Sequence, residues 1–194
     1  MAFAILSKLF QERGEEGYIG EPVTQLQHMS QSAELARASG ASSSLIGACL
    51  LHDVGHLLIE KEQMGMTIAG VYHPLGTKDH ELVGAEYLRS LGITEEVCDL
   101  VEQHVKAKRY LISTTLDYPL SQASQRTLEL QGGRMTPEEQ RRFEQRPNFR
   151  LYLQMRRFDE LAKENSIPSR SWESYRELIA ELNREPELQK DDEI

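Results

Sequence analysis

The sequence contains no hydrophobic run close to the roughly 20 residues that a membrane-spanning helix needs. It is also poor in positive charge, because Lys and Arg total 22 against 31 for Asp and Glu, which gives a net charge of −9. A chain of this sign repels nucleic acid and anionic lipid at long range. We therefore expect neither nucleic acid nor a membrane as a partner.

Cysteines are scarce as well. Cys49 and Cys98 lie far apart, and each has apolar residues near it in the sequence. Such residues are typical of buried free thiols in a reducing compartment. The first ten residues have neither a basic leader nor a small-residue cleavage site, so we expect no secretory signal. These features together predict a cytoplasmic protein.

Alternating strand patterns are absent too, and helical periodicity runs through the chain. We predict an all-α helical bundle, and 194 residues are the size of one domain. The predicted helices span 2–13, 22–39, 43–59, 77–91, 94–108, 120–131, 136–146, 148–164 and 170–184. The longest internal loop, 61–76, is either a lid or a plain surface excursion. The acidic tail 190–194 is expected to be disordered.

The segment 45–59 is apolar on every side except at His52, Asp53 and His56. A helix that is apolar all round is buried, and a carboxylate buried without a partner is costly. These three residues therefore need hydrogen bonds, a counter-ion or a metal ion. A satisfied His-Asp pair in the core is one interpretation, and a metal site is the other.

Further candidate ligands lie in other predicted helices. His28 and His104 lie close to the apolar sides of their helices, whereas His80 begins either a solvated or a core-facing helix. Asp159 shares an inward face with Tyr152, either as a metal ligand or as the partner of a nearby arginine. Helical bundles build metal sites from side chains that converge in this way.

The series His28, His52-Asp53, His80, His104 and Asp159 resembles the HD-domain superfamily, and the extra histidines resemble its two-metal members. More closely, several segments resemble the HD-domain mixed-valent diiron oxygenases of the PhnZ/TmpB type, which use O2 to cleave the carbon-phosphorus bond of 1-hydroxyphosphonates. These segments are 18–21, 25–28, 50–56, 83–89, 104–111 and 126–133. The resemblance covers about 17–163 and implies one HD domain over 1–194, with a C-terminal helix near 170–184.

The resemblance implies a dinuclear site with two iron ions in the mixed-valent Fe(II)/Fe(III) state. By position, one ion would be bound by His28, His52, Asp53 and Asp159, and the other by Asp53, His80 and His104. Asp53 would bridge the two ions. Six ligand residues leave coordination positions open for water, O2 and substrate.

The resemblance also implies how the substrate is held. Tyr18 would occupy an open iron position, and Glu21 would recognise an ammonium group of the substrate. The phosphonate would be bound by His56, Lys108, Ser124, Thr127, Gln131 and Arg156, and the residues with catalytic roles would be Tyr18, Glu21, His56 and Lys108. Lys108 belongs to the basic stretch 106–109, whose other explanation is a solvated helix end.

An ammonium group narrows the substrate to two compounds, each supplied by an upstream hydroxylase. These are 2-amino-1-hydroxyethylphosphonate, which gives glycine, and 1-hydroxy-2-(trimethylammonio)ethylphosphonate, which gives glycine betaine. The long 57–79 loop, with Tyr72 and two methionines, favours the quaternary compound. Two other functions stay open: an HD-type metal-dependent phosphohydrolase acting on a phosphoester or nucleotide, and a non-catalytic regulatory domain that binds a phosphorylated ligand.

Overall fold

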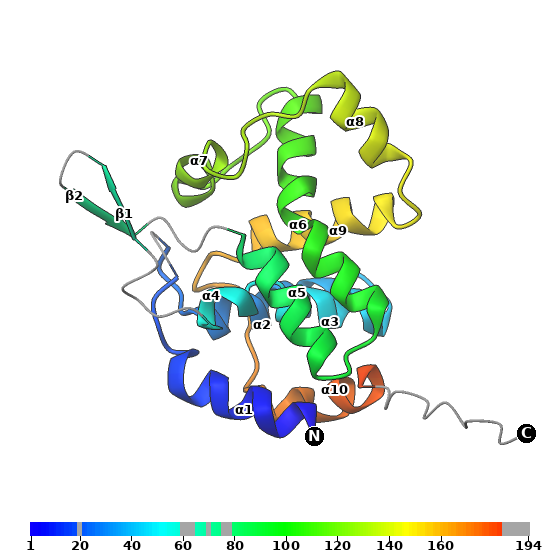
Figure 1. The fold of residues 1–194 in the computed structure, drawn as a ribbon. Coiled ribbons are helices and arrows are strands. Elements are labelled where there is room, and N and C mark those ends of the chain that lie inside the picture. Colours follow the sequence, from blue (N-terminus) through cyan, green and yellow to red (C-terminus); the bar gives the residue numbers. More distant parts are fainter. Residues whose placement is uncertain (19–20, 59–64, 69–70, 75–78, 184–194) are drawn as a thin grey trace, which may run out of the picture.

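Helices dominate the structure, a computed structural model that describes residues 1–18, 21–58, 65–68, 71–74 and 79–183 (Figure 1). The helices are α1 (Ala2–Arg13), α2 (Gln25–Ala38), α3 (Ser43–Leu51), α4 (Val54–Leu58), α5 (His80–Ser90), α6 (Glu95–Thr114), α7 (Gln122–Leu128), α8 (Pro137–Glu144), α9 (Phe149–Leu161), the 3-10 turn η2 (Trp172–Tyr175) and α10 (Arg176–Leu182). The predicted all-α class is confirmed. Within the described ranges, no helix has both the length and the apolar character to cross a membrane.

A small hairpin corrects the prediction that the chain contains no strand. Strands β1 (Gly65–Ile68) and β2 (Val71–Pro74) pair antiparallel, with Ile68 opposite Val71. Each strand has four residues, which is too short for an alternating pattern to be visible in the sequence. The rest of the predicted 61–76 loop and the 190–194 tail lie outside the described residues.

Two predicted helix boundaries also need correction. The helix predicted over 43–59 is interrupted at His52 and Asp53, between α3 and α4. There the Nδ1–H of His52 donates to the carbonyl of Cys49 over 2.9 Å, an acceptor that a continuous helix would bond to residue 53. The helix predicted over 94–108 continues to Thr114, since Leu111 and Ile112 extend its buried face.

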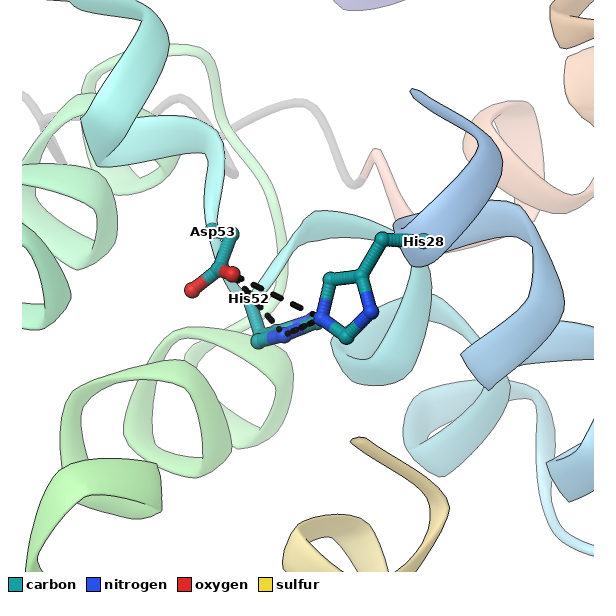
Figure 2. Close-up of side chains that lie close together, drawn as sticks. All are labelled: His28, His52 and Asp53. Carbon is teal, nitrogen blue, oxygen red and sulfur yellow. Dashed lines mark hydrogen bonds and ion pairs between the residues drawn. The ribbon is translucent and has the colours of Figure 1, made fainter. Parts of the chain in front are cut away.

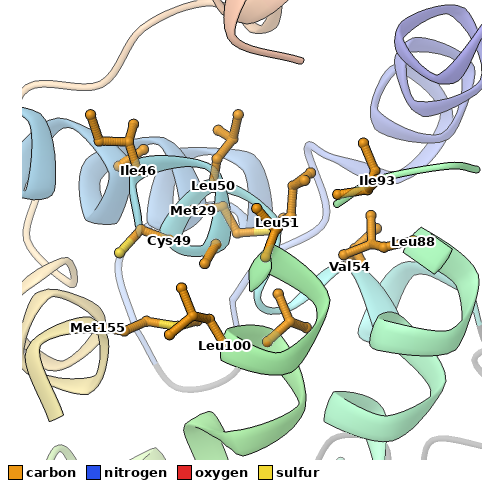
Figure 3. Close-up of a cluster of buried hydrophobic side chains, with 14 of the residues drawn as sticks. Met29, Ile46, Cys49, Leu50, Leu51, Val54, Leu88, Ile93, Leu100 and Met155 are labelled. Carbon is orange, nitrogen blue, oxygen red and sulfur yellow. The ribbon is translucent and has the colours of Figure 1, made fainter. Parts of the chain in front are cut away.

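The hydrophobic core is built around α3, whose residues 45–51 are all buried. Ser42 starts this helix by accepting a hydrogen bond from the backbone of Leu45, and the helix then packs against α2, α6, α9 and α10. Figure 3 shows its Leu50 and Leu51 among side chains from several of these elements. Both cysteines are buried free thiols, as predicted. The core thus fixes the end of α3, where the His-Asp pair follows.

Two glycines set the distance between α4 and α5. A Cβ atom at Gly55 would lie 2.0 Å from the carbonyl oxygen of His80, and one at Gly84 would lie 3.1 Å from the backbone nitrogen of Gly55. Larger residues would force the two helices apart. The close approach brings His80, the first residue of α5, to the residues that follow α3.

Candidate metal centre

The first group of ligand atoms joins three parts of the chain. His28 comes from α2, His52 and Asp53 from the break after α3, and Asp159 from α9. The Nε2 atom of His28 lies 3.1 Å from Nε2 of His52, 3.6 Å from Oδ2 of Asp53 and 3.3 Å from Oδ1 of Asp159. Figure 2 shows the first three of these side chains pointing toward one another. All four are buried, and they converge on one small volume.

The second group forms on the other oxygen of Asp53. Its Oδ1 atom lies 3.4 Å from Nε2 of His80 and 3.6 Å from Nε2 of His104, and the two nitrogens are 3.1 Å apart. His56 flanks this group, with its Nε2 atom 3.9 Å from Asp53 Oδ1 and its ring stacked on that of His80. Asp53 therefore stands between two histidine pairs and turns one carboxylate oxygen toward each.

Backbone hydrogen bonds orient three of the four histidines. The Nδ1 atoms of His28, His52 and His104 lie 2.6, 2.9 and 2.7 Å from the carbonyl oxygens of Ala162, Cys49 and Val101. A carbonyl only accepts, so each Nδ1 carries a proton and each ring turns its Nε2 atom toward the centre. This is the orientation that histidine ligands of metal ions adopt.

Electrostatics in the two groups differ. Burial lowers the pKa of His52, but the carboxylates of Asp53 and Asp159 outweigh it and raise the pKa to about 10. Burial and the neighbouring His80 lower the pKa of His56 to about 3, and they also hold the pKa of His104 well below its ordinary value. The rings of His56 and His104 are therefore neutral.

Two buried oxygens in this centre have no hydrogen-bond partner among the described residues, namely Oδ2 of Asp53 and Oδ1 of Asp159. A buried carboxylate oxygen without a donor is costly. The Nε2 atoms of His28 and His52 are 3.1 Å apart, and so are those of His80 and His104. A cation in each group would bind to these nitrogens and compensate the carboxylate oxygens. Imidazole nitrogens with carboxylate oxygens suit iron, zinc and manganese, so the residues fit a pair of metal ions.

A cavity opens beside the second group. Its lining comes mostly from predicted site residues: Tyr18, Asp53, His56, His80, His104, Lys108, Ser124, Thr127, Gln131, Arg156 and Asp159. Gln25 and Val105 complete the lining and were not predicted. His28 and His52 reach the centre without lining the cavity. Such an arrangement gives a small molecule access to one side of the metal centre.

Another part of the cavity lining is suited to hold an anion. Lys108 is buried and donates to Thr127 Oγ1 over 3.1 Å and to the side chain of Gln131. Burial lowers the pKa of this lysine from 10.5 to about 7, and the nearby Arg156 acts in the same direction. Arg156 itself donates to Ser124 Oγ over 3.1 Å. Two cations and three neutral polar groups thus face one end of the cavity.

Asp159 combines the two roles that the sequence left open. Its Oδ1 atom faces His28 and His52, whereas its Oδ2 atom pairs with Arg156. Both explanations given for the basic stretch 106–109 also apply, each to a different residue. Lys106 is exposed at the helix surface, whereas Lys108 is buried in the cavity wall.

Tyr18 and Glu21 lie in the segment that precedes the N-terminus of α2. The Tyr18 ring stacks on His28 with ring centroids 4.0 Å apart, and burial raises the pKa of its phenol well above the ordinary value. Glu21 donates its backbone N–H to the Tyr18 carbonyl, and its Oε1 atom is buried without a hydrogen-bond partner among the described residues. Glu21 does not line the cavity, but its neighbour Tyr18 does.

Comparisons with known proteins agree with this geometry. A family model described as HD domain matches residues 25–143. The chain is 40% identical over 159 residues to a 1-hydroxy-2-(trimethylamino)ethyl phosphonate dioxygenase (glycine-betaine-forming) of Leisingera caerulea, which covers 80% of this chain and 76% of that protein. It is 42% identical over 161 residues to a hydroxymethylphosphonate dioxygenase of Gimesia maris, with 81% and 76% covered.

A viral protein is similar as well. Over 176 residues the chain is 37% identical to an uncharacterized protein of Acanthamoeba polyphaga mimivirus, and the match covers 89% of this chain and 78% of the viral protein. The family match takes in His28, the His-Asp pair, His80 and His104. The chain therefore belongs to the HD-domain family, on the branch whose named members are phosphonate dioxygenases.

Proposed function

We propose that this protein is a diiron oxygenase that uses O2 to cleave the carbon-phosphorus bond of a small 1-hydroxyphosphonate and releases phosphate. The observation that carries the proposal is the position of Asp53, with one oxygen toward each histidine pair, beside a cavity whose far wall suits an anion. Two relatives named as phosphonate dioxygenases support the same reaction.

In this proposal His28, His52, Asp53 and Asp159 bind one iron, and Asp53, His80 and His104 bind the other. The Fe(II)/Fe(III) pair would activate O2 for the oxidation of the substrate, which protein side chains cannot do. The protein fixes the ligand nitrogens through their backbone hydrogen bonds and keeps one side of the centre open to the cavity.

The phosphonate binds at the other end of the cavity. Lys108 and Arg156 supply positive charge, and Ser124, Thr127 and Gln131 supply polar groups. His56 lines the cavity with its ring stacked on His80, and in this proposal the neutral ring of His56 contacts the substrate. These groups hold the substrate with its C1 hydroxyl toward the centre, which orients the bond to be broken.

An ammonium-bearing substrate accounts for Glu21. Its buried carboxylate oxygen has no donor among the described residues, and a cationic group of the substrate would supply the missing charge. This favours 1-hydroxy-2-(trimethylammonio)ethylphosphonate or 2-amino-1-hydroxyethylphosphonate, made by an upstream hydroxylase. We prefer the quaternary compound, although the side chains of the 59–78 segment that support it lie outside the described residues.

Phosphate release tests the proposal. Iron-loaded protein is given the quaternary compound, the primary amine or hydroxymethylphosphonate, each with and without O2. We expect O2-dependent phosphate release that is fastest with an ammonium-bearing compound. Fast phosphate release from hydroxymethylphosphonate alone would refute the proposed recognition of an ammonium group by Glu21. Release from phosphoesters without O2, with manganese or magnesium, would instead identify a phosphohydrolase.

A further inference from the structure

Helix α7 carries two of the groups in the anion-binding wall, Ser124 and Thr127, yet it lies at the margin of the bundle (Figure 1). Among its described side chains Ser124 alone is buried, while Thr127 and Leu128 are half-buried. Apolar burial therefore contributes little to its position. Polar side chains of α6, of α9 and of the segment that follows α9 hold it instead, and two of these do not line the cavity.

Glu160 is the first of the two. It is the residue after Asp159 in α9, and its carboxylate accepts from the backbone N–H of Ser121 over 2.7 Å and from Ser124 Oγ at 3.4 Å. Ser121 is the residue that caps α7, since its hydroxyl accepts from the backbone of Ser124. Glu160 also pairs with Arg156, so one carboxylate contacts both the cap of α7 and the arginine of the anion-binding wall.

Lys163 is the second. Its ammonium group is buried and lies 3.0 Å from Glu160 Oε2. It donates to the hydroxyls of Ser121 and Ser124, each over 3.1 Å. Two cations and one carboxylate therefore meet at Ser124, and of these three groups only Arg156 lines the cavity.

We propose that Glu160 and Lys163 are positioning residues that fasten α7 to α9 and thereby aim Ser124 and Arg156 at the phosphonate. This inference rests on the proposed function for the identity of the anion. The fastening itself depends only on the contacts described above. Glu160 keeps Arg156 in place while the substrate binds, because it pairs with the same guanidinium from outside the cavity. Lys163 balances the charge of Glu160 and orients the Ser124 hydroxyl.

The test uses the iron-loaded protein with inorganic phosphate as the probe and Glu160→Gln as the variant. Glutamine keeps an oxygen for the Ser121 N–H but loses the charge. We expect amide hydrogen exchange in 122–128 to become about tenfold faster and phosphate to bind about tenfold more weakly. Iron content should stay unchanged. The exposed Glu164→Gln, four residues away in the chain, is the matched control and should behave like the wild type.

A second variant covers the case in which Glu160→Gln fails to fold with two unbalanced cations. In Glu160→Gln/Lys163→Met one cation is removed with the carboxylate, and we expect the same faster exchange and weaker binding. With a hydroxyphosphonate that the wild type turns over, KM should rise about tenfold while kcat changes less than about threefold. Exchange and phosphate affinity equal to those of the wild type would overturn the inference, as would loss of iron in parallel with both. Failure of the wild type to release phosphate would refute the proposed function alone.

Discussion

Tyr18 stacks on His28 with ring centroids 4.0 Å apart and an interplanar angle of 16°. The stacking holds the phenol of Tyr18 beside the first ligand group, where burial and then the charge of Asp53 raise the pKa of the phenol well above its ordinary value. The phenol therefore keeps its proton unless a cation binds next to it. The ring also restricts the imidazole of His28, whose other nitrogen is fixed by the Ala162 carbonyl.

Removing only the hydroxyl of Tyr18 separates the effect of its phenol oxygen from the effect of its ring stacking on His28. We expect Tyr18→Phe to keep the stacking on His28 and the iron content, but to lose any visible absorption from an iron-phenolate bond in the resting enzyme. Tyr18→Ala should in addition lower the iron content, because His28 loses its support. Tyr110→Phe, whose hydroxyl contacts Glu144 outside the cavity, is the control. An unchanged absorption band in Tyr18→Phe would contradict this role.

Asp53 provides the most direct test of the metal centre. We expect Asp53→Asn to lower the content of both metal ions more than about tenfold, since one amide oxygen cannot replace a bridging carboxylate. Metal content is measured by elemental analysis after dialysis. Asp117→Asn is a matched control, because Asp117 is exposed and asparagine tolerates its positive φ of 52°. Loss of one ion with full retention of the other would refute the bridging position.

Gly55 offers a test in which no ligand residue is substituted. An added Cβ would clash with the His80 carbonyl, so Gly55→Ala should displace α5 and move His80 away from Asp53. We expect the second metal ion to bind at least about tenfold more weakly and stability to fall by roughly 1–3 kcal/mol. Gly17→Ala is the control, because a Cβ there meets nothing within 4 Å. Titration with metal and urea unfolding would measure both effects.

Lys108 predicts a dependence of stability on pH. Its pKa falls from 10.5 to about 7 on folding, mainly through burial, so the folded protein disfavours the charged form. Below about pH 7 both states carry the proton and the full cost applies, whereas above 10.5 neither does and the cost vanishes. When both proteins are metal-free, the free energy of unfolding of Lys108→Met should therefore exceed that of the wild type by roughly 1–3 kcal/mol near pH 6.

That advantage should shrink as the pH rises toward 10, because the wild-type lysine then loses its proton in the unfolded state too. Urea unfolding of both proteins in phosphate-free buffer provides the comparison, and the difference between them cancels other titrating groups. An advantage of Lys108→Met that is equal at both ends of this range would show that the lysine is not the cause.

The sequence predicted the helical class because apolar periodicity is a local property. The ligands could be proposed for a related reason, since polar residues on a buried helix need partners. The break at His52 and Asp53 could not be predicted, as it depends on a hydrogen bond from the His52 side chain to its own helix. Glu160 and Lys163 were missed because charged residues near a helix end look like a solvated surface. Only the position of α7, which is distant in the chain, reveals that Lys163 is buried and Glu160 half-buried.

The ion pair between Arg156 and Asp159 joins the two halves of the cavity. The carboxylate of Asp159 interacts with this arginine through one oxygen and with the metal centre through the other. A cation bound at the metal centre therefore weakens the ion pair between Asp159 and Arg156. The guanidinium of Arg156 then interacts more strongly with an incoming anion. By thermodynamic reciprocity the anion must then tighten the cation by the same factor. The protein would thus retain its metal ions best while substrate is bound, and a shortage of the metal would affect it least under the conditions in which it turns over most substrate.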